Sequence, residues 1–148
     1  ADIDNIKLIG FGAIDAGIKD QVMQWVDGNK VMYVGWVTPE QSYQYFAAAD
    51  LVVFPGRHSV FWEQVVGQGI PMIVKDWTGT HHVDVGGNVQ FLKCSNTDEI
   101  RTLILKIYNN KEQYSDMKDV AQNKGKEVFS YKKISQRSIS LDKSVIEE

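Results

Sequence analysis

The sequence has little cysteine, no long apolar run and little net charge, and each shortage excludes a class of protein. Cys94 is the single cysteine in 148 residues, so an internal disulfide is excluded and a reducing compartment is favoured. No run of 18 apolar residues predicts a membrane span, and the first residues lack the basic-then-apolar pattern of a signal peptide. A net charge of −3 gives no reason to expect nucleic acid. We therefore expect a soluble protein of the cytoplasm.

Short apolar runs alternate with segments of helical spacing along most of the chain. The runs expected to be strands are 6–9, 31–34, 51–54, 70–74 and 89–92. The segments expected to be helices are 14–27, 38–49, 60–67, 96–109, 111–129 and 131–146. Strands that are apolar throughout predict a parallel sheet covered on both faces. The fold class is therefore α/β: one domain over 1–148, a three-layer αβα, Rossmann-like, doubly wound parallel sheet of about five strands in the order 2-1-3-4-5, with C-terminal helices over 111–148.

Two helix starts carry capping sequences. Thr38 precedes a proline and stands three residues before Gln41, and Asn96 stands three residues before Glu99. A short polar side chain at the cap accepts a backbone N–H of the first turn, and the later Glu or Gln can reach back. Both patterns predict a capping box at the helix N-terminus.

The loop after the third strand is the candidate site. In doubly wound sheets, ligands bind beyond the carboxyl ends of the strands. Pro55 ends the strand here, Ser59 is expected to cap the next helix with its hydroxyl, and Arg57 and His58 lie between them. Backbone amides and the positive end of the helix dipole converge at such a place, so it is predicted to bind phosphate. The polar segment 75–88 is expected to be a second binding loop or partly mobile.

A series of motifs resembles the C-terminal, donor-binding half of a GT-B glycosyltransferase of the retaining kind (group 1, family 4-like). The motifs are a strand with a Gly-x-Gly loop at 8–12, the strand 31–37, Tyr-Phe-Ala-Ala-Ala-Asp-Leu-Val-Val-Phe-Pro at 45–55, Val-x-x-Glu at 60–63, Gly-Ile-Pro-Met-Ile-Val at 69–74, and the Gly-Gly pair at 86–87. The resemblance covers most of the chain and rests on the order of the motifs.

The resemblance implies a hexosyltransferase of two Rossmann-like lobes. The nucleotide-sugar donor, a UDP- or GDP-sugar, would bind this lobe, and the acceptor would bind an N-terminal lobe that this chain lacks. Transfer in the family needs no metal or other cofactor. Its members of this kind act in bacterial surface polysaccharide, capsule or lipopolysaccharide synthesis. This half alone is expected to be inactive.

The resemblance also assigns roles to residues. Glu63 would hold the ribose hydroxyls, with Gln64 as the alternative because Glu63 lies one residue further from Pro71 than the family spacing. Amides from Ser59 to Phe61 would hold the diphosphate. Residues near Gly35-Trp36 would meet the base, and the loop at Gly79-Thr80 would close on the donor. The full substrate-binding set is Gly12, Gly35, Trp36, Arg57, His58, Ser59, Val60, Glu63, Gln64, Gly79 and Thr80. No catalytic residue is assigned.

The sequence departs from the family in two places. No glutamate lies upstream of Glu63 in its segment, where the family has one for the sugar, and the region holds Arg57 to Ser59 instead. The family's first strand, with a Gly-Arg…Lys loop, is absent. That strand would normally lie between the strands at 6–9 and 51–54. The chain is therefore a fragment, or its sheet closes over the gap.

The sequence gives less support to other functions. His81, His82 and Asp84 suggest a metal, but adjacent histidines point in different directions and no third ligand has regular spacing, so no metal site is assigned. A receiver-type or flavodoxin-like module would need acidic residues that the strand ends lack. A GT-B-like nucleotide-sugar epimerase stays open as an alternative. The segment 124–143, with six cations and two acidic residues, also leaves open peripheral binding to the inner face of a membrane.

Overall fold

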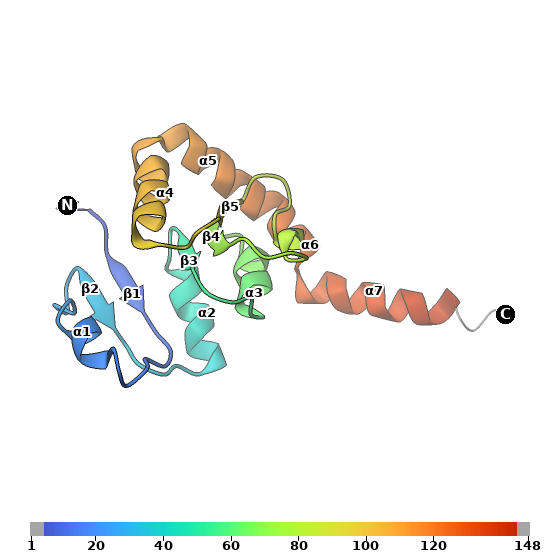
Figure 1. The fold of residues 1–148 in the computed structure, drawn as a ribbon. Helices are drawn as coiled ribbons and strands as arrows, with labels where there is room; N and C mark the ends of the chain where they lie inside the picture. Colours follow the sequence, from blue (N-terminus) through green and yellow to red (C-terminus); the bar gives the residue numbers. More distant parts are fainter. Residues whose placement is uncertain (1–4, 145–148) are drawn as a thin grey trace. The chain divides into compact units, whose positions relative to one another are not determined.

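The computed structural model describes residues 5–144, which form two compact units (Figure 1). The first ends at Gln44 and the second begins at Tyr45. The elements are β1 (Leu8–Gly10), α1 (Lys19–Met23), β2 (Val31–Tyr33), α2 (Pro39–Ala47), β3 (Val52–Phe54), α3 (Phe61–Gln68), β4 (Met72–Lys75), η1 (His81–Val83), β5 (Val89–Leu92), α4 (Thr97–Asn109), α5 (Lys111–Val120), η2 (Ala121–Gly125), α6 (Lys126–Val128) and α7 (Tyr131–Ser144). The end of the helix predicted for 131–146 lies outside the described residues.

The first unit contains a parallel pair of strands, in which Leu8 of β1 faces Val31 of β2. The helix predicted for 14–27 is reduced to the five residues of α1. Turns take the preceding residues, because the carboxylate of Asp15 accepts the amide of Gly17 at 2.8 Å. The prediction that every strand is covered on both faces is wrong for β1, whose Leu8 is exposed.

The capping box at the start of α2 is present as predicted. The amide of Thr38 donates to Oε1 of Gln41 at 2.9 Å, and the amide of Gln41 donates to Oγ1 of Thr38 at 3.3 Å. Each side chain therefore satisfies a backbone donor that the first turn leaves without an intrahelical partner.

The second unit is built on the parallel sheet β3-β4-β5. Val53 of β3 faces Ile73 of β4, and Ile73 faces Gln90 of β5. The neighbours within each sheet are those of the predicted order 2-1-3-4-5, but the five strands are divided into two sheets. The division falls between β1 and β3, where the resemblance expects the missing central strand.

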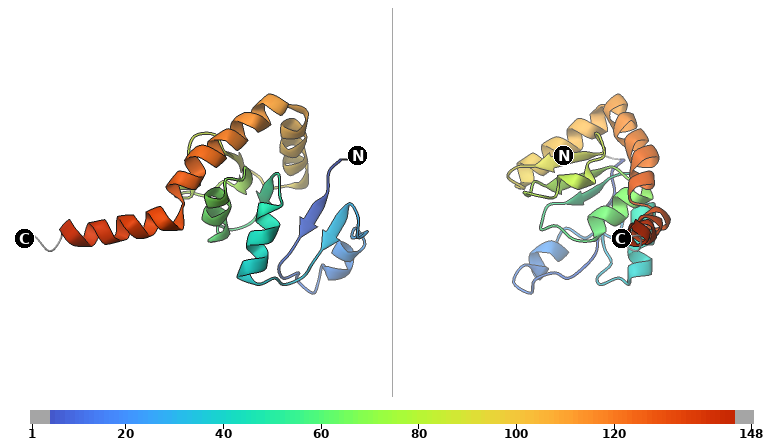
Figure 2. Two further views of the ribbon diagram at one scale, coloured as in Figure 1. Left: turned by 180° about the vertical axis from the view of Figure 1, so that it is seen from behind. Right: turned by 90° about the vertical axis from the view of Figure 1, so that its right-hand side faces the viewer.

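Helices cover both faces of β3-β4-β5 (Figures 1 and 2). Under α4 and α5, a core cluster of buried side chains comprises Ile73, Leu92, Ile107 and Met117. On the opposite face α3 buries Trp62, whose ring stacks on Phe54 at 6.2 Å between centroids. This is the predicted three-layer arrangement, and its apolar burial is the main force that holds α3 in place.

Glycines allow α3 to approach the helical segment η2–α6 closely. A Cβ added to Gly125 would lie 2.7 Å from the carbonyl oxygen of Val66, and one added to Gly67 would lie 2.9 Å from that of Phe129. The π-helical turn η2 interrupts the helix predicted as continuous over 111–129. This close packing holds the C-terminal half of α3 against η2 and the residue that follows α6.

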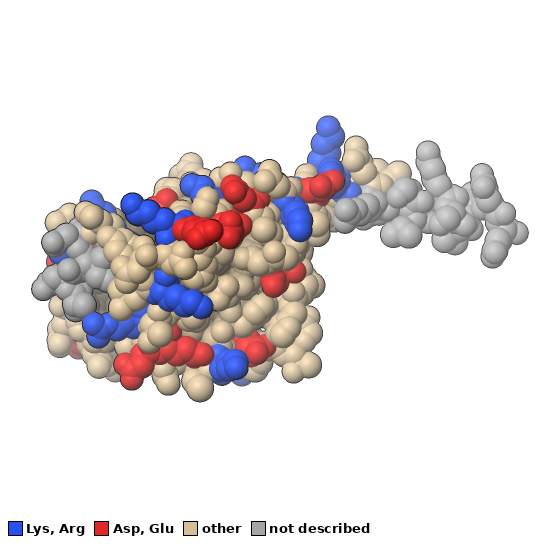
Figure 3. All heavy atoms as spheres, turned by 90° about the horizontal axis from the view of Figure 1, so that it is seen from above, with Lys and Arg blue, Asp and Glu red and all other residues tan. Residues whose placement is uncertain are grey.

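On the face of the molecule drawn in Figure 3, neither positive nor negative side chains dominate the surface. Lysine and arginine side chains lie beside aspartate and glutamate side chains across that face. Among the described residues, no helix combines the length and apolar character needed to cross a bilayer.

Candidate functional site

The loop from Pro55 to Val60 connects the carboxyl end of β3 to α3, as predicted, but the cap differs. Val60, not Ser59, is the N-cap residue, and no side chain caps the helix. Val60 has helical backbone angles (φ −57°, ψ −14°), so the first turn closes on the carbonyl of Ser59, which accepts the amide of Trp62 at 3.0 Å. The hydroxyl of Ser59 is therefore not used as a cap.

The loop after β4 lies beside the loop after β3. Nε1 of Trp77 donates to the carbonyl of Gly56 at 3.2 Å, which joins the two loops directly. The hydroxyl of Thr80 donates to the carbonyl of Trp77 at 2.8 Å and closes a tight turn, in which Gly79 has φ +86°. A residue with a side chain would be strained at that angle, so glycine is needed there.

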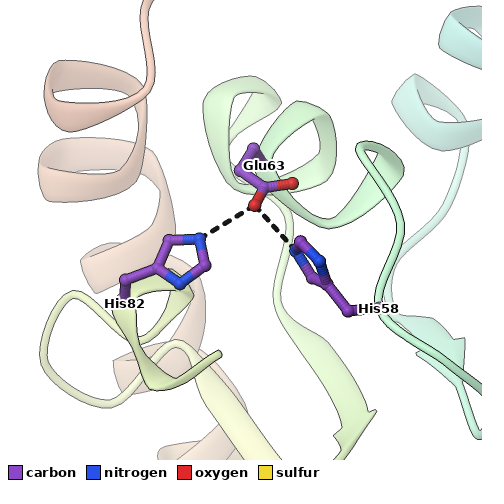
Figure 4. A group of neighbouring side chains, drawn as sticks. All are labelled: His58, Glu63 and His82. Carbon is purple, nitrogen blue, oxygen red and sulfur yellow. Dashed lines mark hydrogen bonds and ion pairs between the residues drawn. The ribbon is translucent and has the colours of Figure 1, made fainter. Parts of the chain in front are cut away.

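A cluster of three side chains connects these loops to α3 (Figure 4). Nε2 of His58 and Nε2 of His82 each lie 2.8 Å from Oε1 of Glu63. The other carboxylate oxygen, Oε2, is buried and has no hydrogen-bond partner among the described residues. The three side chains keep 35%, 29% and 46% of their surface for His58, Glu63 and His82, so solvent reaches the cluster.

Two opposing effects act on the Glu63 carboxyl. Burial raises its pKa, but the hydrogen bonds with His82, with the backbone amide of Glu63 itself and with His58 together outweigh burial and hold the pKa below its usual value. Glu63 is therefore an ionised acceptor whose exposed oxygen is already shared by two imidazoles.

The neighbouring histidine takes no part in the cluster. Nε2 of His81 lies 2.6 Å from Oδ1 of Asp76, and its ring packs on Phe91 at 4.4 Å between centroids. His81 and His82 therefore point to different partners, as the sequence predicts for adjacent histidines. Sequence reasoning missed that His82 meets His58 and Glu63, because the contact depends on β3 and β4 being parallel neighbours whose following loops share one edge.

The other predicted residues take the following places. Arg57 is exposed, and Ser59 is partly buried. Gln64 is partly buried, with its Oε1 buried and without a partner among the described residues. In the first unit the amide of Gly12 donates to the carbonyl of Gly35 at 2.8 Å, so the loops after β1 and β2 meet.

Trp36 follows these loops and is 82% exposed. A fully presented indole is suited to stacking on a flat ring, which is the role that the resemblance predicts for this position. Its part in binding stays a prediction.

The fold has close counterparts among solved structures. Sucrose-phosphate synthase from Thermosynechococcus elongatus matches 98% of this chain with a TM-score of 0.74 at 16% identity. Anabaena HepE, in complex with UDP, matches 95% with a TM-score of 0.71 at 18% identity. A Listeria monocytogenes protein assigned as a UDP-N-acetylglucosamine 2-epimerase matches 93% with a TM-score of 0.71 at 16% identity.

The chain spans 40%, 42% and 37% of the length of these three proteins. A scan against protein-family models gives no match, and a search of curated protein sequences gives none either. At these identities the likeness establishes the fold: a Rossmann-like lobe of the GT-B kind, as the resemblance predicts.

Proposed function

We propose that this chain is the donor-binding lobe of a retaining GT-B glycosyltransferase that transfers a hexose from a nucleoside diphosphate sugar without a metal cofactor. The observation that carries the proposal is the loop after β3, which leads from the carboxyl end of a parallel strand through Arg57 to α3 and Glu63, in a fold shared with a protein solved in complex with UDP. Acceptor and pathway, a bacterial surface polysaccharide made at the inner face of the membrane, follow from the resemblance alone.

The diphosphate fits the start of α3. The first backbone N–H groups of a helix have no intrahelical acceptor, and the helix dipole adds partial positive charge there. Arg57 is exposed three residues before the helix cap, Val60, so its guanidinium can reach an anion bound at that end. Charge-assisted hydrogen bonds of this kind are the strong ones in phosphate binding.

The ribose fits Glu63. An ionised carboxylate accepts two hydroxyl hydrogen bonds, and a glutamate carboxyl is ionised near neutral pH. Nucleotide hydroxyls would replace the imidazoles at Oε1, since those hydrogen bonds lie at the surface. By the resemblance alone, Gly79 and Thr80 would cover the sugar.

The acceptor would bind a second lobe. The chain spans less than half of the length of the proteins whose fold it shares, and nothing in the described residues supplies a second Rossmann-like half. We therefore propose donor binding by this chain and transfer only together with an acceptor lobe.

Calorimetric titration of the chain with UDP and with GDP, in buffer containing a chelator, tests the proposal. We expect at least one nucleotide to bind, and Arg57→Ala and Glu63→Ala to weaken binding by about tenfold or more, the value of a lost charge-assisted hydrogen bond. Gln64→Ala distinguishes the alternative ribose position. Arg101→Ala, which removes an exposed arginine from α4, is the matched control. No binding by wild type, or an equal loss in the control, would contradict the proposal.

A nucleotide-sugar epimerase is the second candidate, favoured by the likeness to the Listeria protein. An epimerase needs no acceptor, so incubation with UDP-N-acetylglucosamine alone should change the sugar. Proton NMR of the sugar ring distinguishes the two functions, because a transferase without acceptor leaves its configuration unchanged.

A further inference from the structure

We propose that His58, Glu63 and His82 form a binding site for a divalent transition-metal ion of the zinc class. This inference goes beyond nucleotide binding and does not depend on it, because it rests on the side-chain cluster alone. Within the described residues, this is the group whose ligand atoms converge: all lie within 4.8 Å of one another.

The chemistry of the three ligands selects the class of ion. Imidazole nitrogen and carboxylate oxygen are common zinc ligands, and two histidines with one carboxylate also serve iron(II) in enzymes. Magnesium and calcium prefer all-oxygen sites, so a set with two imidazoles disfavours them. Three protein ligands leave at least one coordination position open, which water would fill.

The geometry needs only a small adjustment to hold an ion. Both Nε2 atoms lie 2.8 Å from Oε1 of Glu63. Ligand atoms around a tetrahedral zinc at bond lengths of about 2.0–2.1 Å are about 3.3 Å apart. Opening each Nε2–Oε1 pair by about half an ångström, with the two Nε2 atoms, which lie within 4.8 Å of each other, brought to the same spacing, converts the hydrogen-bonded cluster into a coordination sphere. One cation then replaces the protons that now bridge the three groups.

The supporting contacts hold the ligands in this arrangement. Glu63 follows the fully buried Trp62 on α3, and the His58 ring packs edge-on against that indole at 4.9 Å between centroids. His82 precedes the buried Val83 in η1, and its ring lies 6.1 Å from that of Phe129. Rings fixed in this way lose little freedom when an ion binds, which favours affinity.

The carboxylate also offers an unused oxygen. Oε2 of Glu63 is buried without a hydrogen-bond partner among the described residues, and a buried acceptor without a partner is costly. A cation at the cluster would stabilise the charge shared by both oxygens. The partial exposure of all three side chains gives an ion a route to the site.

Titration of the tag-free chain with Zn²⁺, in competition with a chromophoric chelator and without nucleotide, tests the site. We expect one ion per chain at high affinity, and Co²⁺ to give the intense visible absorption of a four-coordinate site. His58→Ala, His82→Ala and Glu63→Gln should each lower the affinity by at least about tenfold, since loss of an outer-shell partner already costs that much. Circular dichroism establishes that each variant is folded.

Two variants serve as matched controls. His81→Ala removes the adjacent histidine, which pairs with Asp76, and Cys94→Ser removes the exposed thiol. Both should bind Zn²⁺ as wild type does. The site is overturned if wild type binds no stoichiometric Zn²⁺, or if His81→Ala lowers the affinity as much as His82→Ala. Either result leaves the nucleotide proposal standing, because its own test uses a buffer that contains a chelator.

Discussion

Nε2 of His82 lies 2.8 Å from Oε1 of Glu63, and this hydrogen bond joins the segment after β4 to the helix that follows β3. Glu63 is the residue proposed to bind ribose, and His82 is not part of that proposal. The carboxylate therefore has competing partners: the imidazoles, a metal ion held with them, and a nucleotide.

The first prediction concerns this competition. Zn²⁺ at 100 times its dissociation constant should weaken UDP or GDP binding by up to about 100-fold, because metal and ribose need the same carboxylate. EDTA should restore the nucleotide affinity. Calorimetry with and without Zn²⁺ measures the effect.

The control for that prediction is His82→Ala. This variant loses a metal ligand but keeps Glu63. Because its Zn²⁺ affinity should fall at least about tenfold, the same Zn²⁺ concentration should weaken its nucleotide binding by about tenfold at most. The comparison also corrects for Zn²⁺ bound by the nucleotide in solution. Equal weakening in both proteins would show that the metal acts elsewhere.

The second prediction concerns the packing of α3 on η2. Gly125 has helical backbone angles (φ −60°), so helix propensity alone favours Gly125→Ala by about 1 kcal/mol. The added Cβ would lie 2.7 Å from the carbonyl oxygen of Val66. The cost of overpacking should exceed the gain in helix propensity, so the variant should have a free energy of unfolding lower by about 1–3 kcal/mol. Urea unfolding measures it.

Gly56→Ala is the comparison for that variant, because nothing lies within 4 Å of the Cβ it would add. It should change the free energy of unfolding much less. If Gly125→Ala instead raised the free energy of unfolding, α3 and η2 would be able to move apart at little cost in packing.

The third prediction concerns Glu99 and pH. Amides of Lys93, Cys94 and Ser95 donate to its carboxylate at 2.7, 2.8 and 2.7 Å. The amide of Lys93 has the largest effect on the pKa of Glu99; with the other two it outweighs partial desolvation and holds that pKa below its usual value. A lowered folded-state pKa gives stability that is present above the unfolded-state pKa and is lost as pH falls through the folded-state pKa.

Glu99→Gln should therefore lower the melting temperature near neutral pH, and the difference from wild type should shrink below about pH 4, where the unfolded-state carboxyl titrates. Thermal unfolding at several pH values measures this. Glu112→Gln, on the exposed first turn of α5, should show no such pH-dependent difference. A constant difference for Glu99→Gln across pH would contradict the account.

The fourth prediction concerns Tyr114, which ties α5 to the segment before β3. Its hydroxyl donates to the carbonyl of Asp50 at 3.1 Å. Tyr114→Phe should lower the free energy of unfolding by about 1 kcal/mol, the net value of one hydrogen bond. Tyr108→Phe, at an exposed position on α4, should change it little. Chemical denaturation of both variants decides whether the hydroxyl matters.

Local signals predicted much of the fold. The last strand has the predicted bounds, Val89–Leu92, and Asn96 caps α4 by accepting the amide of Glu99 at 2.8 Å. The carboxylate of Glu99 was expected to reach back to the cap, but it binds three earlier amides instead. Capping depends on residues a few positions apart, so the sequence contains it, whereas the path of the preceding loop does not follow from local spacing.

Longer-range features were less predictable. The apolar spacing from Ile14 to Trp25 predicts a long helix, but the turn at Asp15 and Gly17 shortens it, since one side-chain hydrogen bond to the backbone competes with a helical turn. The cluster of His58, Glu63 and His82 could not be predicted from local sequence, because His82 lies in the segment after β4 and the other two residues follow β3. Strand adjacency creates that contact, and strand adjacency was itself only an expectation.

The two loops beside α3 are held together by side chains, through the indole of Trp77 and the imidazole of His82, rather than by a strand ladder. The segment after β4 is anchored by the fully buried Val83, so only its outer hydrogen bonds are open to exchange. An arriving molecule would exchange one set of surface hydrogen bonds for another, and the core beneath would keep its shape throughout.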